Sequence, residues 1–187
     1  MELRVFSEIG RLECLMTHRP GPEVDCMPPA LMEELLFDDI LYGPVAREEH
    51  DVFTSAIRAF GARNLDFFDL LVEALAVDDE ATERLVRRVG EREHLRADQL
   101  ERLADLPAGE LALALVAGVP QPPEHMSLER FFALHPLPNL LMSRDPQVVL
   151  GDGLIIASMK SRARAREAEL SQFVFSMHPE LSEQPHY

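Results

Sequence analysis

The spacing of apolar residues changes along this chain from strand-like to helical and back, and this change limits the folds open to it. Residues 11–17 (RLECLMT) alternate charged and apolar positions before Arg19-Pro20-Gly21, which predicts a strand that ends in a turn. From residue 44 to residue 60 apolar residues recur every three or four positions, which indicates an amphipathic helix. A short strand is predicted at 63–65. The N-terminal part of the chain is therefore expected to form an α/β unit.

The middle of the chain has a different pattern. Between residues 66 and 134, leucines and other apolar residues fall at helical spacing with charges between them, and prolines divide the segment, so we expect a bundle of four or five short helices. Further on, the apolar runs 148–150 and 154–156 flank Gly151-Asp152-Gly153, which predicts a β-hairpin. Helical spacing returns at 162–178. The pattern thus predicts an α/β fold interrupted by a helical bundle.

Charge and composition exclude several classes of protein. The 187 residues fit one domain, or one domain with an insertion, and 18 basic against 33 acidic residues give a formal net charge of −15. Such a chain is a poor candidate for binding nucleic acid or an anionic membrane surface, whereas a cationic small molecule is electrostatically favoured. The longest apolar stretch, Leu111–Val119, is too short to span a bilayer, and no signal peptide is visible. We therefore expect a soluble, cytoplasmic protein.

The two cysteines are Cys14 and Cys26. They are too few for a disulfide framework, and neither lies at a spacing typical of metal ligands. We expect two reduced thiols and no metal site.

Polar residues are concentrated in one stretch, PLPNLLMSRDP at 136–146. Asn139, Ser143, Arg144 and Asp145 follow two stiffening prolines and directly precede the predicted hairpin. Loops on a rigid scaffold often carry binding or catalytic groups, so this stretch is a candidate site. The alternative is a turn in which Asn139 and Asp145 bond only to the backbone. Pattern alone leaves both readings open.

Several segments, taken in order, resemble the bacterial arginine deiminase family, from about residue 6 to residue 179 and more weakly through the helical bundle. They are SEIGRLECLMTHRPG at 7–21, ELLFDDI at 34–40, the spaced Ala46, His50 and Phe53, PLPNLLMSRDP at 136–146, Ala163-Arg164 with Arg166-Glu167, and His178-Pro179.

The resemblance implies a fold and a reaction. The fold is the pentein fold, a five-bladed α/β propeller with a helical insertion. Here it implies a first blade at 1–66, an inserted helical bundle at 67–134, and the substrate loop, hairpin and helix that begin a second blade at 135–187. The reaction is hydrolysis of L-arginine to L-citrulline and ammonia through attack by a cysteine thiolate, with a histidine that moves protons. Neither a metal nor an organic cofactor is implied.

The resemblance also implies roles for five residues. Asp145 matches a guanidinium-binding aspartate, and a carboxylate suits the paired N–H donors of a planar cation. Asn139 matches a residue that contacts the amino-acid end of the substrate, and Arg164 matches the residue that pairs with its α-carboxylate. Leu36 matches a pocket-lining leucine. Met142 replaces the usual phenylalanine, and its thioether offers no aromatic face to the guanidinium.

The family's catalytic groups have no counterpart in this sequence. None of the seven histidines begins a His-x-Asp motif, and no cysteine follows Cys26. We therefore expect part of a substrate-binding shell for L-arginine without its nucleophile. Three readings stay open: the N-terminal part of an arginine deiminase, a free-standing arginine-binding or regulatory module, or a structural remnant without a ligand. A complementing C-terminal chain is expected in the first case. The isolated chain is expected to self-associate, with the hairpin at 148–156 and the helix at 162–178 as contact surfaces, or to be marginal in stability.

Overall fold

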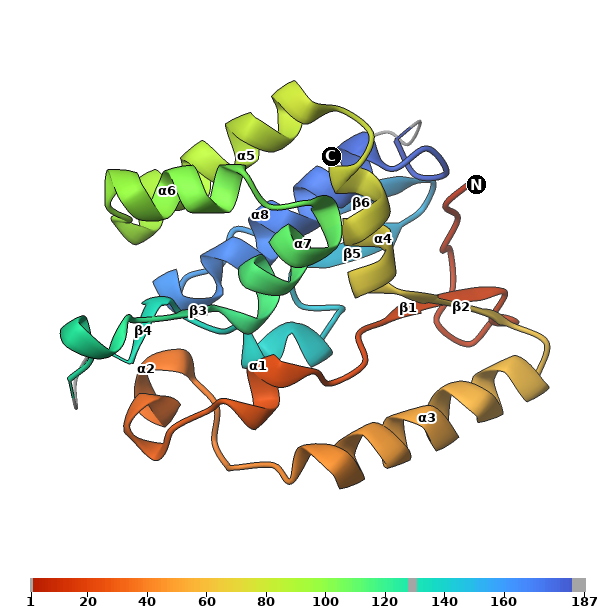
Figure 1. Ribbon diagram of the computed structural model, residues 1–187. Helices are drawn as coiled ribbons and strands as arrows, with labels where there is room; N and C mark the ends of the chain where they lie inside the picture. The colour runs from red at the N-terminus through yellow and green to blue at the C-terminus, as the bar shows by residue number, and fades with distance from the viewer. Residues whose placement is uncertain (1, 128–130, 183–187) are drawn as a thin grey trace.

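The computed structural model describes residues 2–127 and 131–182, and within these ranges the chain is a mixed α/β structure with three separate two-stranded sheets (Figure 1). The strands are β1 (Cys14–Thr17), β2 (Arg63–Asp66), β3 (Val119–Pro120), β4 (Phe132–Leu134), β5 (Gln147–Leu150) and β6 (Gly153–Ile156). The α-helices are α1 (Pro22–Asp25), α2 (Met32–Leu35), α3 (Gly43–Ala59), α4 (Phe67–Leu75), α5 (Asp79–Glu93), α6 (Ala97–Ala104), α7 (Ala108–Ala117) and α8 (Arg162–Met177). Three short 3-10 helices are η1 (Pro29–Leu31), η2 (Pro123–His125) and η3 (Pro138–Leu141).

The N-terminal part forms the expected α/β unit. Strand β1 pairs in parallel with β2, with Cys14 opposite Arg63 and Thr17 opposite Asp66, and α3 makes the crossover that a parallel pair requires. Asp66 joins this sheet to the next helix, because its side chain accepts from the Phe68 amide at 2.8 Å and caps α4. The predictions at 11–17, 44–60 and 63–65 are confirmed, with the first strand shorter than expected.

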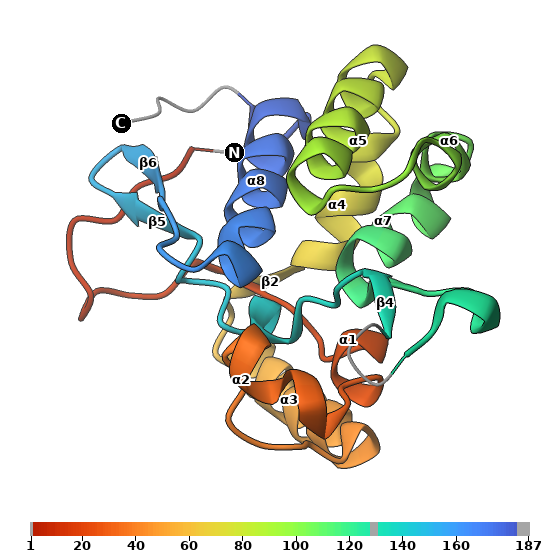
Figure 2. The same ribbon diagram turned by 90° about the vertical axis from the view of Figure 1, so that its left-hand side faces the viewer.

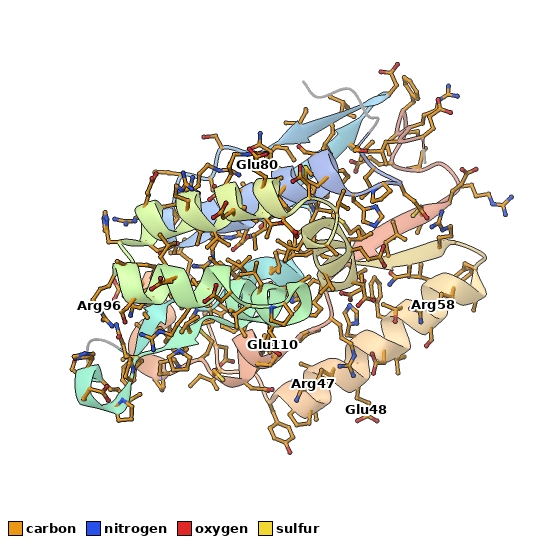
Figure 3. The ribbon with its side chains drawn as sticks, turned by 45° about the horizontal axis from the view of Figure 1, so that its top comes forward. Arg47, Glu48, Arg58, Glu80, Arg96 and Glu110 are labelled. Carbon is orange, nitrogen blue, oxygen red and sulfur yellow. The ribbon has the colours of Figure 1, made fainter. Side chains whose placement is uncertain are left out.

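Helix α3 is amphipathic as predicted, but its apolar stripe faces solvent. Val52 is 67% exposed and Phe60 is 86% exposed, whereas the side turned toward the protein presents Thr54, which is buried, and His50, which is half-buried. The sheet beside α3 has two strands and is too narrow to cover this stripe. Figure 3 shows the charged Glu48 of the same helix projecting away from the body of the molecule.

The hydrophobic core lies where α4, α5, α7 and α8 meet. Its buried members include Leu71, Leu85, Leu115 and Leu170. Helix α8 runs between the β5–β6 hairpin and helices α4 and α5 (Figure 2). The same core takes residues from all three segments distinguished in the sequence, from Leu3 near the N-terminus to Leu154, Leu170 and Leu181. The helical segment and its flanking strands therefore pack as one body.

In the described parts of the segment after α7, residues 119–127 and 131–134, the chain forms no α-helix, contrary to the prediction. After α7 the chain forms the antiparallel pair β3–β4, with η2 between them, and the Gln121 amide donates to the Phe131 carbonyl at 2.9 Å. Prolines at 120, 122 and 123 lack the N–H that a helix needs. The predicted bundle is therefore four helices, α4–α7, followed by a strand pair.

The hairpin and the C-terminal helix are confirmed at 147–156 and 162–177. The hairpin turns at Gly151, whose φ is 62°, and Gly151 also exchanges two backbone hydrogen bonds with Val5, at 2.7 and 2.8 Å. The hairpin exposes Leu150 and Ile155. Helix α8 instead buries most of its length, from Arg166 to Phe175. The expectation that α8 serves as an association surface is therefore wrong, because the core already covers it.

Two further features bear on function. None of the described helices is long and apolar enough to cross a membrane. Over residues 2–127 and 131–182, no group of three or more His, Cys, Asp or Glu side chains is placed to hold a metal ion.

Gly118 offers a test of the turn after α7. It adopts φ 80° and ψ 173°, a conformation open essentially only to glycine, and an added Cβ would lie 2.5 Å from the Leu134 carbonyl oxygen. We expect Gly118→Ala to lower the free energy of unfolding by about 2–3 kcal/mol in urea titrations. Gly109→Ala lies in α7 with nothing within 4 Å of the added Cβ; it is the control and should keep the stability or raise it by up to about 1 kcal/mol. Two equally stable variants would contradict this account of the turn.

Candidate functional site

The stretch 136–146 is held against the rest of the protein by contacts to distant parts of the chain. The Ser143 hydroxyl donates to the Met16 carbonyl of β1 at 3.0 Å, and the Gln147 side-chain amide donates to the Ser143 carbonyl. The Asp145 amide closes a turn onto the Met142 carbonyl at 2.9 Å. Asp145 is therefore presented on a short turn whose two ends are fixed.

Asn139 has a structural partner. Its side-chain Nδ2 donates to the Leu35 carbonyl at 2.7 Å and ties η3 to the end of α2. The next residue, Leu36, ends α2 in a left-handed conformation with φ 55°, and its side chain is exposed. The Asn139 side chain is thus tied to the backbone of the residue that precedes Leu36.

Asp145 and Arg164 come into direct contact. The Arg164 Nη1 donates to Asp145 Oδ2 at 2.7 Å. On its other side, the same guanidinium donates to Glu167 from Nη2 at 2.7 Å and from Nε at 3.1 Å. The Arg164 side chain is 15% exposed, Asp145 is 49% exposed and Glu167 is 1% exposed. The Arg164 guanidinium therefore lies between the buried carboxylate of Glu167 and the half-exposed carboxylate of Asp145. Both contacts are hydrogen bonds between charged groups, which are stronger than those between neutral groups.

Arg164, Glu167 and Asp145 form a charged trio whose pKa shifts follow from burial and pairing. Burial raises the pKa of Glu167, against the lowering effect of Arg164. Burial disfavours the charged form of Arg164, but the hydrogen bonds to Glu167 and Asp145 outweigh it, and the pKa of Arg164 is raised. Arg164 therefore stays cationic.

Met142 completes the predicted set, and its side chain is exposed. Leu36 is also exposed and Asp145 is half-exposed, whereas Asn139 is buried and Arg164 is largely buried. Two hollows lie elsewhere: one beside α3, lined by Arg19, Arg47 and Asp51 among others, and an apolar one between α6 and the β3–β4 pair.

The sequence analysis did not single out Glu167, Arg166 or Ser171 as site residues. The Arg164–Glu167 pair could have been found, because residues three apart on a helix are neighbours. Arg166 is buried, donates to the His135 carbonyl and lies 3.3 Å from Glu93, and burial lowers its pKa to about 10. The Ser171 hydroxyl lies 2.5 Å from Gln147 Oε1. Arg166 and Ser171 thus connect α8 to the two ends of the stretch that carries Asp145.

The two thiols lie in the N-terminal part. Cys14 is half-buried in β1, and burial raises the pKa of its thiol, with Arg63 opposing and Glu180 reinforcing the shift. Cys26 directly follows α1 and is exposed. A nucleophilic cysteine needs a lowered pKa, so Cys14 is not activated by its surroundings.

Comparison with known proteins agrees with the motifs. The family model of arginine deiminase matches residues 33–109 and 120–187. The chain is 37% identical to an arginine deiminase of Limosilactobacillus fermentum, over 97% of this chain and 48% of the relative. It is 34% identical to an arginine deiminase of Oenococcus oeni, over 96% of this chain and 47% of the relative. It is 32% identical to an arginine deiminase of Borrelia duttonii, over 95% of this chain and 47% of the relative.

The chain spans about half the length of the curated relatives it matches. The segments that the family model matches include α2, η3 with the Asp145 turn, and α8, the elements that carry Leu35, Asn139, Asp145 and Arg164. The chain belongs to the arginine deiminase family.

Proposed function

We propose that this chain is the arginine-binding N-terminal portion of an arginine deiminase-type hydrolase, which converts L-arginine and water to L-citrulline and ammonia. The observation that supports this most is the contact of Asp145 with a guanidinium group at 2.7 Å. That group belongs to Arg164, but it has the same planar cation that a substrate arginine carries. This contact supports the role of Asp145 as a guanidinium-binding carboxylate.

The other residues have complementary roles in this proposal. Arg164 pairs with the α-carboxylate of the substrate, Asn139 contacts its amino-acid end, and Leu36 and Met142 line its aliphatic part. Three methylene groups separate the two charged ends of arginine, whereas Asp145 and Arg164 touch each other here. Binding of L-arginine therefore requires these two side chains to separate.

The nucleophile and the proton-transfer histidine lie outside these residues in our proposal. We assign 1–66 to a first propeller blade, 67–134 to an inserted helical domain and 135–187 to the start of a second blade. The parallel β1–β2 pair with its α3 crossover and the β5–β6 hairpin followed by α8 support two α/β units of this kind. No cofactor is required.

Binding can be tested by titrating the isotope-labelled chain with L-arginine and following backbone amide chemical shifts. We expect shifts confined to residues around Asp145, Asn139 and Arg164, with a dissociation constant on the order of 1 mM, equivalent to about 4 kcal/mol. Binding is weak because a half-exposed carboxylate is screened by water and salt. The neutral side chain of L-citrulline should produce smaller shifts. Shifts that are absent, or that lie on α3 or α6 instead, would contradict the proposal.

Uncovered apolar surface predicts self-association of the purified chain. The stripe on α3, the hairpin residues Leu150 and Ile155, and Phe6 and Ile9 near the N-terminus are all exposed, and apolar surface of this kind is normally covered. We expect the sedimentation coefficient to rise with concentration. The double variant Val52→Ser with Phe60→Ser should reduce this rise, whereas Glu48→Gln on the same helix should not. A compact monomer at every dilution would count against this expectation.

A further inference from the structure

The guanidinium of Arg164 is shared unequally by its two carboxylates. Glu167 lies three residues along the same helix, is almost fully buried, and receives both Nε and Nη2. Asp145 lies on a turn, is half exposed to water, and receives only Nη1. The contact with Glu167 is therefore the firmly held one, because it is bidentate and shielded from solvent. The contact with Asp145 is a single, hydrated hydrogen bond that can exchange.

The charges of the trio leave room for a second cation. One guanidinium between two carboxylates leaves one negative charge uncompensated within the trio. An external guanidinium that binds Asp145 in place of Arg164 would compensate this negative charge, while Arg164 stays paired with Glu167. Loss of the Asp145 contact therefore does not strand Arg164 as a buried, unpaired ion, which would be strongly unfavourable.

We infer that Arg164 is an internal guanidinium ligand of Asp145, and that Glu167 is a positioning residue that holds Arg164 when an external guanidinium displaces it. The inference rests on the proposed function, in which Asp145 binds the guanidinium of arginine. In the free protein Arg164 occupies Asp145; in the bound protein Arg164 is held by Glu167 and is available to a carboxylate. Glu167 thus determines how easily the site opens.

Two substitutions shift this competition in opposite directions. Arg164→Lys retains a cation for Glu167 but removes the planar fork that reaches both carboxylates. It should therefore raise the affinity for methylguanidinium about threefold. Glu167→Gln removes the competing carboxylate, so that Arg164 binds Asp145 alone, and should lower this affinity by about the same factor. A purely structural role of Glu167 gives no reason for opposite effects.

The experiment is a titration of the full chain with methylguanidinium chloride, read from the Asp145 amide shift, with sodium chloride matching the ionic strength. The control is Arg144→Lys, a substitution of the same kind at the neighbouring exposed residue, which pairs with Glu8; its affinity should equal that of wild type. Circular dichroism checks that each variant is folded. In wild type, independently of any variant, the Arg164 Nη–H resonance should move together with the Asp145 amide, because Nη1 is the group that donates to Asp145.

The outcomes separate the two ideas. If methylguanidinium and L-arginine both leave Asp145 unperturbed, the proposed function and this inference fall together. If methylguanidinium binds at Asp145 but the Arg164 Nη–H resonance stays fixed, or both variants bind it as wild type does, only the internal-ligand inference is overturned. Opposite shifts in the two variants, with Arg144→Lys unchanged, support it.

Discussion

The isolated chain is expected to form no citrulline from L-arginine above the uncatalysed rate. Attack on a guanidinium carbon needs a thiolate placed against that carbon and a group that protonates the departing ammonia. Cys14 is half-buried in β1 with a raised pKa, and Cys26 lies exposed beyond α1. Binding at Asp145 would orient the substrate without supplying a nucleophile. Colorimetric detection of citrulline over several hours measures this directly.

Activity should appear when a chain that supplies the C-terminal His-x-Asp and cysteine is added, and it should disappear again with Asp145→Ala in this chain. Cys14→Ala and Cys26→Ala should leave the reconstituted activity unchanged. Citrulline formation by the purified chain alone, surviving both cysteine substitutions, would show that the assignment of the missing chemistry is wrong.

Arg166→Ala should lower the free energy of unfolding by about 3 kcal/mol, because it removes one partner of a buried ion pair. The Arg166 side chain is 2% exposed, donates to the His135 carbonyl and pairs with Glu93 on α5. Its removal leaves both partners without a donor and opens a cavity in the protein interior. Urea denaturation followed by circular dichroism gives the change in midpoint.

The matched control is Arg84→Ala, which removes an exposed pair with Glu80 on the outer side of α5, where Figure 3 labels Glu80. Exposed pairs one helical turn apart contribute about 0.3–0.5 kcal/mol, so this variant should remain close to wild type. Arg166→Met, which fills the space without the charge, should lose less stability than Arg166→Ala. Wild-type stability of Arg166→Ala would mean that α8 is held by its apolar contacts alone.

Local pattern is enough to predict most of the elements. The alternation at 11–17, the helical spacing at 44–60 and the Gly-Asp turn of the hairpin each depend on neighbouring residues only, and the strand, helix and hairpin are present. The prediction of a helix through Phe131 and Phe132 is wrong because a short apolar run does not distinguish helix from strand. Prolines on the preceding segment, which remove helical N–H groups, carry the correct signal.

The contacts that shape the candidate site could not be predicted in this way. Ser143 bonds to Met16 across 127 positions, and Asn139 bonds to Leu35 across 104. Such contacts arise from packing between elements and leave no periodic signal. The sequence likewise does not predict that the apolar stripe of α3 is exposed, because amphipathicity shows which face is apolar but not what covers it. The family resemblance makes Asp145 and Arg164 candidate site residues, whereas their direct contact is visible only in the structure.

The alternative of a free-standing arginine-binding or regulatory module shares the surface around Asp145 and differs in the consequence of binding. A module of that kind would bind L-arginine without gaining activity from any complementing chain. The reconstitution assay separates it from a portion of a hydrolase. Both readings depend on arginine recognition by Asp145.

Calorimetric titration of L-arginine into the wild-type chain and into Asp145→Asn tests that dependence most directly. The substitution keeps the shape of the side chain and removes the charge, and Glu8→Gln, which alters the exposed partner of Arg144, controls for the change in net charge. We predict measurable heat in wild type and in Glu8→Gln, and none above dilution in Asp145→Asn, with the three proteins equally folded. Equal binding of L-arginine by wild type and Asp145→Asn would contradict the account.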